Sequence, residues 1–160
     1  LTSQINFICM LNLLLKTIWL IEAHLMNILN LLYSVDQIIQ RFWRPTTIFL
    51  LLIILFLSLY PLPQLPIMGK GADKLYHFIA YITLVLPLGY AQPKYTFFYL
   101  FTLILISGTI EVIQTYVNRY GEWLDFLANT LGIFVGFLVG KIVAKFMKNR
   151  IMMSWKWEKS

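Results

Sequence analysis

The polar side chains that could do chemistry in this sequence lie within or beside long apolar stretches. They form three closely spaced pairs: Asp73 with His77, Glu111 with Gln114, and Asp125 with Asn129. On a helix, a spacing of three or four residues places both members of a pair on one face. An ionised group inside a membrane span costs on the order of 3 kcal/mol, so such groups usually face a bundle interior and often mark function. The pairs therefore predict one polar site built from three helices.

The candidate catalytic residues are His77, Glu111 and Asp125. In one interpretation, His77 transfers a proton while Asp73 orients its imidazole, and Glu111 and Asp125 form an acid–base carboxylate pair. In the structural alternative, Asp73 and Asp125 cap their helices and His77 hydrogen-bonds Glu111 or a carbonyl. A salt bridge from Glu111 or Asp125 to Lys74 or Arg119 would then pin the loops. The sequence leaves both interpretations open.

Further residues near the same predicted level are candidates for ligand binding: Asp73, Lys74, Gln114, Arg119 and Asn129. Lys74 and Arg119 would hold phosphate or carboxylate, while Gln114 and Asn129 would orient groups by hydrogen bonds. Neighbouring aromatic residues, Tyr81 among them, are typical of a membrane-interface belt. His77, Glu111 and Asp125 are residue types that can bind a metal, but no HExxH-like spacing is present. We therefore predict neither a metal nor a cofactor.

The elements that must position these residues are membrane helices. Of the 160 residues, 59% are hydrophobic and 12% charged, against about 25% charged in ordinary soluble domains. Apolar length predicts four spans, at 46–66, 73–89, 95–114 and 125–147. The fold class is therefore all-α, a polytopic bundle of about four transmembrane helices. We divide the chain into an N-terminal segment (1–44), a transmembrane domain (45–147) and a basic tail (148–160).

The N-terminal segment has two interpretations. Residues 26–44 carry polar side chains at three- and four-residue steps, which predicts an amphipathic helix in the membrane interface. Residues 5–33 are also apolar enough for an additional span. A further interpretation of the segment is a non-native extension, since the chain starts with Leu rather than Met.

Orientation follows from the basic residues. With four spans, nine Lys and Arg fall on the side of the even connections and both termini, against three on the other side. Basic residues mark cytoplasmic loops, so we predict a cytoplasmic C-terminus and an extracytoplasmic polar site. The net charge of +6 then indicates contact with anionic membrane lipids rather than with nucleic acid.

Small residues recur at four-residue steps in the last span: Gly132, Gly136 and Gly140. Such a stripe lets another helix approach closely, and we assign these glycines to helix packing. The same stripe is the candidate contact of a homodimer.

The segments DKLYHFIAY (73–81), GTIEVIQ (108–114) and DFLANTLGIFVG (125–136), together with Arg119, resemble the VanZ-like family, which is named after a teicoplanin-resistance protein. The resemblance extends over about residues 46–145. The family's Pro-Gly-Arg appears here as Val117, Asn118 and Arg119, a departure that leaves the arginine in place. The resemblance implies a bacterial cell-membrane protein linked to glycopeptide susceptibility, and it supplies no mechanism.

Two functional hypotheses from different classes follow. In the first, the site acts on or binds a lipid-linked or peptidoglycan-related ligand, or a glycopeptide, with His77 and Glu111 transferring protons. In the second, the protein is a non-catalytic scaffold or accessory factor for another envelope protein. The absence of a recognisable nucleophile motif favours the second. A transporter ranks below both, because no internal repeat is present.

Overall fold

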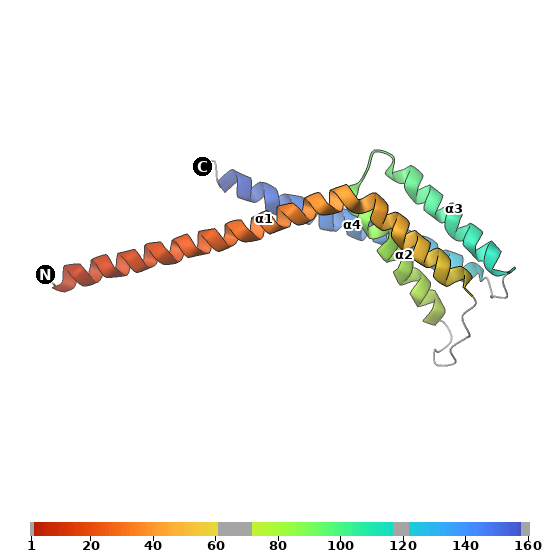
Figure 1. The fold of residues 1–160 in the computed structure, drawn as a ribbon, viewed down its shortest axis with the longest axis horizontal. Helices are drawn as coiled ribbons and strands as arrows, with labels where there is room; N and C mark the ends of the chain where they lie inside the picture. Colours follow the sequence, from red (N-terminus) through yellow and green to blue (C-terminus); the bar gives the residue numbers. More distant parts are fainter. Residues whose placement is uncertain (1, 61–71, 117–121, 158–160) are drawn as a thin grey trace.

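The computed structural model, which describes residues 2–60, 72–116 and 122–157, contains four α-helices and no strand over those residues. They are α1 (Thr2–Leu59), α2 (Ala72–Ala91), α3 (Thr96–Gln114) and α4 (Trp123–Trp157). The helices converge in one bundle, from which the first half of α1 and the end of α4 extend (Figure 1). The predicted all-α fold class is confirmed.

Three of these helices are long and apolar enough to cross a membrane: Leu15–Leu59, Thr96–Gln114 and Trp123–Met152. The remaining helix, α2, carries Asp73, Lys74 and His77 in its first two turns and packs against α4 along its length. The stretch Leu15–Leu59 of α1 has 45 residues, which are about 67 Å long at 1.5 Å per residue. A hydrocarbon core is about 30 Å thick, so only part of α1 fits across it.

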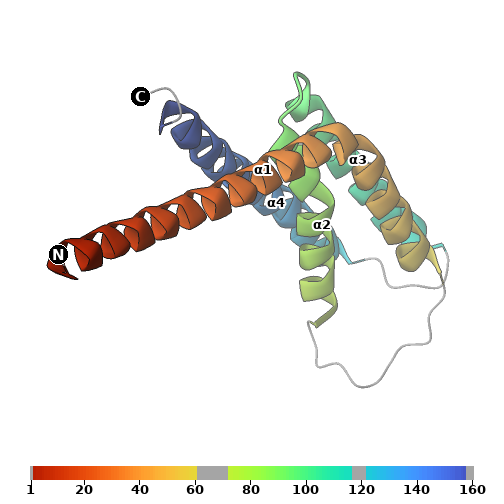
Figure 2. The same cartoon turned by 60° about the vertical axis from the view of Figure 1, so that its left-hand side comes forward.

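The helix expected over residues 26–44 is continuous with the span that follows it. Pro45 lies inside α1, where it removes one backbone N–H and bends a helix without necessarily ending it. The axis of α1 changes direction in its orange section (Figure 2). Beyond this bend, Leu50, Leu51 and Ile54 pack against the core of the bundle.

The closest contact in the bundle is between α2 and α4, which run parallel from the same end. A Cβ added at Gly132, Gly136 or Gly140 would lie 2.6, 2.5 or 2.6 Å from a carbonyl oxygen of α2. These oxygens belong to Phe78, Ile82 and Leu86, so the contact advances by four residues on both helices. The glycine stripe is therefore occupied by α2 of the same chain, which removes it as the contact of a homodimer.

The other two helices run in the opposite direction and close the bundle. The buried residues of α3 recur at three- and four-residue steps and so form one inward face: Leu100, Leu103, Ser107, Glu111 and Gln114. On α1, the inward residues include Asp36 and Trp43. Asp36 accepts a hydrogen bond of 2.7 Å from the Tyr90 hydroxyl of α2, and Trp43 packs edge to face on Tyr99 of α3.

Substituting Gly136 tests the α2–α4 contact. In Gly136→Ala, the new Cβ would meet the backbone of Ile82, so we expect a loss of about 1–3 kcal/mol in the free energy of unfolding. The control is Gly108→Ala, whose Cβ would meet only the ring edge of Phe126, at 3.3 Å. Reversible unfolding in detergent should show the loss for Gly136→Ala alone; equal effects would contradict the close approach.

Candidate functional site

The predicted polar residues that the structure describes gather at the bundle end where α2 and α4 begin. The outermost layer is centred on the ammonium group of Lys74 in α2. Its Nζ lies 3.1 Å from Asp73 Oδ2, 2.8 Å from Glu122 Oε2 and 3.7 Å from Asp125 Oδ1. The Asp125 side chain is buried, with 7% of its surface exposed, whereas those of Asp73 and Glu122 are about half exposed. Lys74 thus joins α2 to the start of α4.

This layer lies in the first turns of α2 and α4, where helix dipoles favour carboxylates. The hydrogen bonds from Lys74 to Glu122 and to Asp73 raise the pKa of Lys74 above its usual value. Desolvation alone would raise the pKa of Asp73, but the hydrogen bond and charge of Lys74 lower it below its ordinary value. At neutral pH the layer therefore contains a lysine cation and at least one carboxylate anion.

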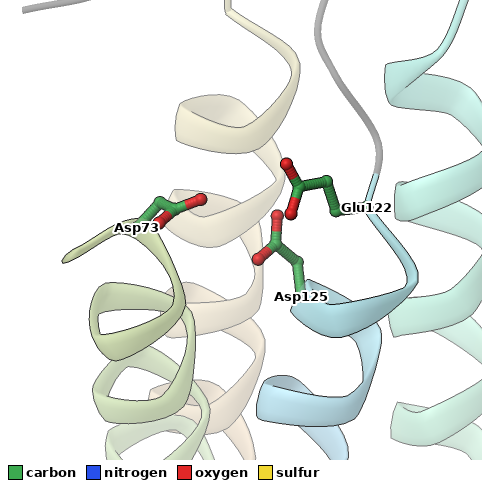
Figure 3. A group of neighbouring side chains, drawn as sticks. All are labelled: Asp73, Glu122 and Asp125. Carbon is green, nitrogen blue, oxygen red and sulfur yellow. The ribbon is translucent and has the colours of Figure 1, made fainter. Parts of the chain in front are cut away.

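Three carboxylates of this layer also have the arrangement of a cation site. Asp73, Glu122 and Asp125 point toward one another from the starts of α2 and α4 (Figure 3), with ligand oxygens within 4.8 Å of each other. Hard divalent cations such as Ca²⁺ take carboxylate oxygens of this kind. Here, however, the Lys74 ammonium contacts all three carboxylates and already supplies the positive charge.

The next layer inward is a hydrogen-bonded chain through three helices. His77 Nδ1 of α2 lies 3.1 Å from Asn129 Oδ1 of α4. Asn129 Nδ2 in turn donates a 3.0 Å hydrogen bond to Glu111 Oε1 of α3. His77 Nδ1 is also 3.9 Å from Glu111 Oε1. Asn129 is 1% exposed and Glu111 7% exposed, whereas the His77 side chain is 18% exposed. The chain is therefore buried at Asn129 and Glu111 and part-buried at His77.

This chain fixes the protonation pattern of His77. Because Asn129 Nδ2 donates to Glu111, the amide oxygen of Asn129 faces His77 and can only accept. His77 Nδ1 must therefore carry a proton, which leaves the lone pair of the neutral imidazole on Nε2. The imidazole can accept a proton at Nε2, and the Glu111 carboxylate would stabilise the resulting cation through Asn129. Glu111 and Asn129 are positioning residues in this arrangement.

Two predicted pairings are replaced by others in the structure. Asp73 bonds Lys74, and the imidazole of His77 is oriented by Asn129. Glu111 lies with Asn129 and His77, while Asp125 lies with Lys74. The predicted carboxylate pair is thus divided between two layers. Gln114 donates a 3.0 Å hydrogen bond to the Ser58 carbonyl and ties α3 to α1.

Other predicted features lie elsewhere or outside the described residues. Tyr81 is 1% exposed and belongs to the core, so its assignment to an interface belt was wrong. Arg119 falls outside the described residues. Sequence reasoning missed Glu122 as a partner of Lys74 and missed Ser107, which is fully buried on α3. Ser107 lies four residues before Glu111, and that spacing was the signal available.

The fold and the site define a polytopic α-helical membrane protein with a buried polar site at one end of its bundle. Residues 5–144 match the family described as VanZ/LLP1. The chain therefore belongs to the VanZ/LLP1 family, which confirms the resemblance and extends it into α1, beyond the motifs recognised from residue 46 onward. None of the curated proteins and none of the solved structures matches the chain.

Replacing Lys74 tests the charge balance of the outer layer. In Lys74→Met, three carboxylates face one another uncompensated, which raises their pKa values above those of the unfolded chain, near 4. The destabilisation is then absent below about pH 4, where both states are protonated, and grows as the pH rises. Millimolar Ca²⁺ at pH 7 should restore part of the lost stability by taking the place of the ammonium.

The measurement is the midpoint of thermal unfolding at pH 5 and pH 7, with and without Ca²⁺. The control is Lys94→Met, because Lys94 is exposed at the other end of α2, over the ring of Tyr95. Neither this control nor the wild-type protein should respond to Ca²⁺. A Lys74→Met variant that is equally stable at both pH values would refute the proposed charge balance.

Proposed function

We propose that this member of the VanZ/LLP1 family is a bacterial cytoplasmic-membrane protein whose polar site faces outward and binds a lipid-linked or peptidoglycan-related ligand. Binding there would alter susceptibility to glycopeptides such as teicoplanin. His77 accepts or donates a proton at Nε2 or holds the ligand by a hydrogen bond there. The observation that carries the proposal is the His77–Asn129–Glu111 chain, which orients a part-buried imidazole directly beneath the charged layer around Lys74.

The charges of the site limit which functional groups this ligand can present to it. Among the described residues, four carboxylates of the site, on Asp73, Glu111, Glu122 and Asp125, face Lys74 and His77. Because Lys74 is engaged by three carboxylates, its charge is not free to hold a phosphate. Amine and hydroxyl groups, which donate hydrogen bonds to carboxylates, suit the site better. Stem peptides and glycopeptides carry such groups.

The distribution of basic residues supports the outward orientation. Lys94 is exposed in the turn between α2 and α3, at the end opposite the polar site. Lys141, Lys145, Lys148 and Arg150 are exposed on the second half of α4, away from the site. Basic residues favour the cytoplasmic side, so the polar end is expected on the other side.

A second function is favoured by a different observation. Lys74 and Gln114, both candidates for ligand binding, are engaged in contacts between helices. A site whose polar groups mainly hold the bundle together suits a non-catalytic factor that supports another envelope protein. In that case His77 and Glu111 contribute to binding or assembly, and no substrate is turned over.

Cysteine labelling tests the orientation. In a Cys9→Ala background, Glu122→Cys places a thiol at the half-exposed rim of the site, and Lys94→Cys places one at the opposite end. An impermeant maleimide applied to intact cells should label the first thiol and reach the second only after permeabilisation. The reverse pattern would place the site in the cytoplasm and exclude an outward-facing ligand.

Substituting His77 tests the role of Nε2. His77→Asn keeps an amide N–H in place of Nδ1–H for the bond to Asn129 but removes Nε2. We expect it to retain the wild-type midpoint of thermal unfolding and to abolish the change in teicoplanin susceptibility that expression of the wild-type protein confers. Glu111→Gln should reduce that change, because the carboxylate that stabilises an imidazolium is lost. Susceptibility is measured at matched membrane levels.

The control is Thr109→Val, because Thr109 is exposed and bonds only within its own helix. Purified protein with labelled lipid-linked precursors then separates the two functions. Turnover that His77→Asn abolishes supports catalysis, whereas binding without turnover supports the accessory role. A His77→Asn variant that retains full activity in cells would refute any role for Nε2.

A further inference from the structure

Two fully buried hydroxyl groups lie directly beneath the His77–Asn129–Glu111 chain. Tyr81 is 1% exposed and Ser107 0% exposed. Within the part of the chain that the structure describes, neither hydroxyl forms a hydrogen bond of regular distance and angle. The Tyr81 hydroxyl of α2 nevertheless lies close enough to Ser107 of α3 to interact with it. Neither residue has a place in the chemistry described above.

The two residues continue the polar faces of their helices by one turn. Tyr81 follows His77 by four residues on α2, and Ser107 precedes Glu111 by four on α3. The corresponding residue of α4, four after Asn129, is Ile133, which is fully buried. The next residues inward are Leu84, Val85 and Leu103, all buried and apolar. The hydroxyls are thus the last polar side chains before the core.

A buried hydroxyl without a partner is unfavourable. Leaving one unpaired lowers the folding equilibrium constant by roughly 5- to 150-fold, so buried hydroxyls in folded proteins nearly always have a partner, often an ordered water. A buried water forms two to four hydrogen bonds to polar groups around it. Two adjacent hydroxyls one turn below a carboxylate supply the required donors and acceptors.

We propose that a water molecule binds between the hydroxyls of Tyr81 and Ser107 and extends the His77–Asn129–Glu111 chain inward by one step. It would satisfy both hydroxyls and hydrate the inner side of Glu111. The chain would end there, because Ile133, Leu84 and Leu103 offer no further polar group. Protons could then exchange only toward the rim, which suits a one-sided site and not a pathway across the membrane. This inference does not depend on which ligand the site binds.

Removing each hydroxyl tests the proposal through the direction in which the folding equilibrium constant changes. If the water is present, Tyr81→Phe and Ser107→Ala each remove one of its partners, and each should lower the folding equilibrium constant by roughly five- to tenfold. Their effects should also be non-additive, because both act on one water. Tyr90→Phe is the matched positive control, since its buried hydroxyl has a known partner in Asp36. Tyr76→Phe, at an exposed position, should have no effect.

An infrared measurement separates a bound water from a direct bond between the hydroxyls. Wild-type protein equilibrated with H₂¹⁸O should show an isotope-shifted O–H band of a bound water that both variants lack. Unchanged or increased stability in both variants would overturn the proposal, because the hydroxyls would then have no partner to lose. Coupled destabilisation without an isotope-sensitive band would overturn it as well, in favour of a direct hydroxyl–hydroxyl bond. Neither result bears on susceptibility or ligand turnover.

Discussion

The parallel contact between α2 and α4 sets the geometry of everything else in this bundle. Because Gly132, Gly136 and Gly140 have no side chain, the backbone of α2 lies where their Cβ atoms would be. The contact repeats every four residues on both helices, so it fixes their register as well as their separation. This register brings Lys74 to the level of Asp125, and His77 to the level of Asn129. A shift by one turn would separate Lys74 from Asp125 and His77 from Asn129.

The polar layers are stable in apolar surroundings because most of their groups find partners on other helices. Lys74 bonds Glu122, and Asn129 bridges His77 and Glu111. Gln114 bonds the backbone of α1. Hydrogen bonds between membrane helices are individually modest, so their number and the glycine contact together specify the bundle. The same bonds leave His77 Nε2 outside the chain, which is the condition for that atom to meet a ligand.

Much of this arrangement could be predicted from the sequence, because membrane helices are specified by apolar length and their polar faces by spacing. The bounds of α2 and α3, the glycine contact and the convergence of His77, Glu111 and Asn129 all follow from such patterns. The partners could not be predicted, because they depend on register between helices. Spacing placed Asp73 beside His77, yet Lys74 bonds Asp73 and Asn129 orients the imidazole. The continuity of α1 through Pro45 could also not be predicted, since a proline bends some helices and ends others.

Gly132 shows how packing and chemistry are joined in this fold. A Cβ added at Gly132 would lie 3.1 Å from the Cβ of Tyr81 and would also meet the backbone of Phe78. A larger residue at 132 would therefore displace the Tyr81 side chain, which lies one turn below His77. Gly132 thus serves helix packing and also sets the position of a side chain next to the polar chain. Because this one contact supports both the bundle and the inner end of the site, a substitution at Gly132 should alter both together.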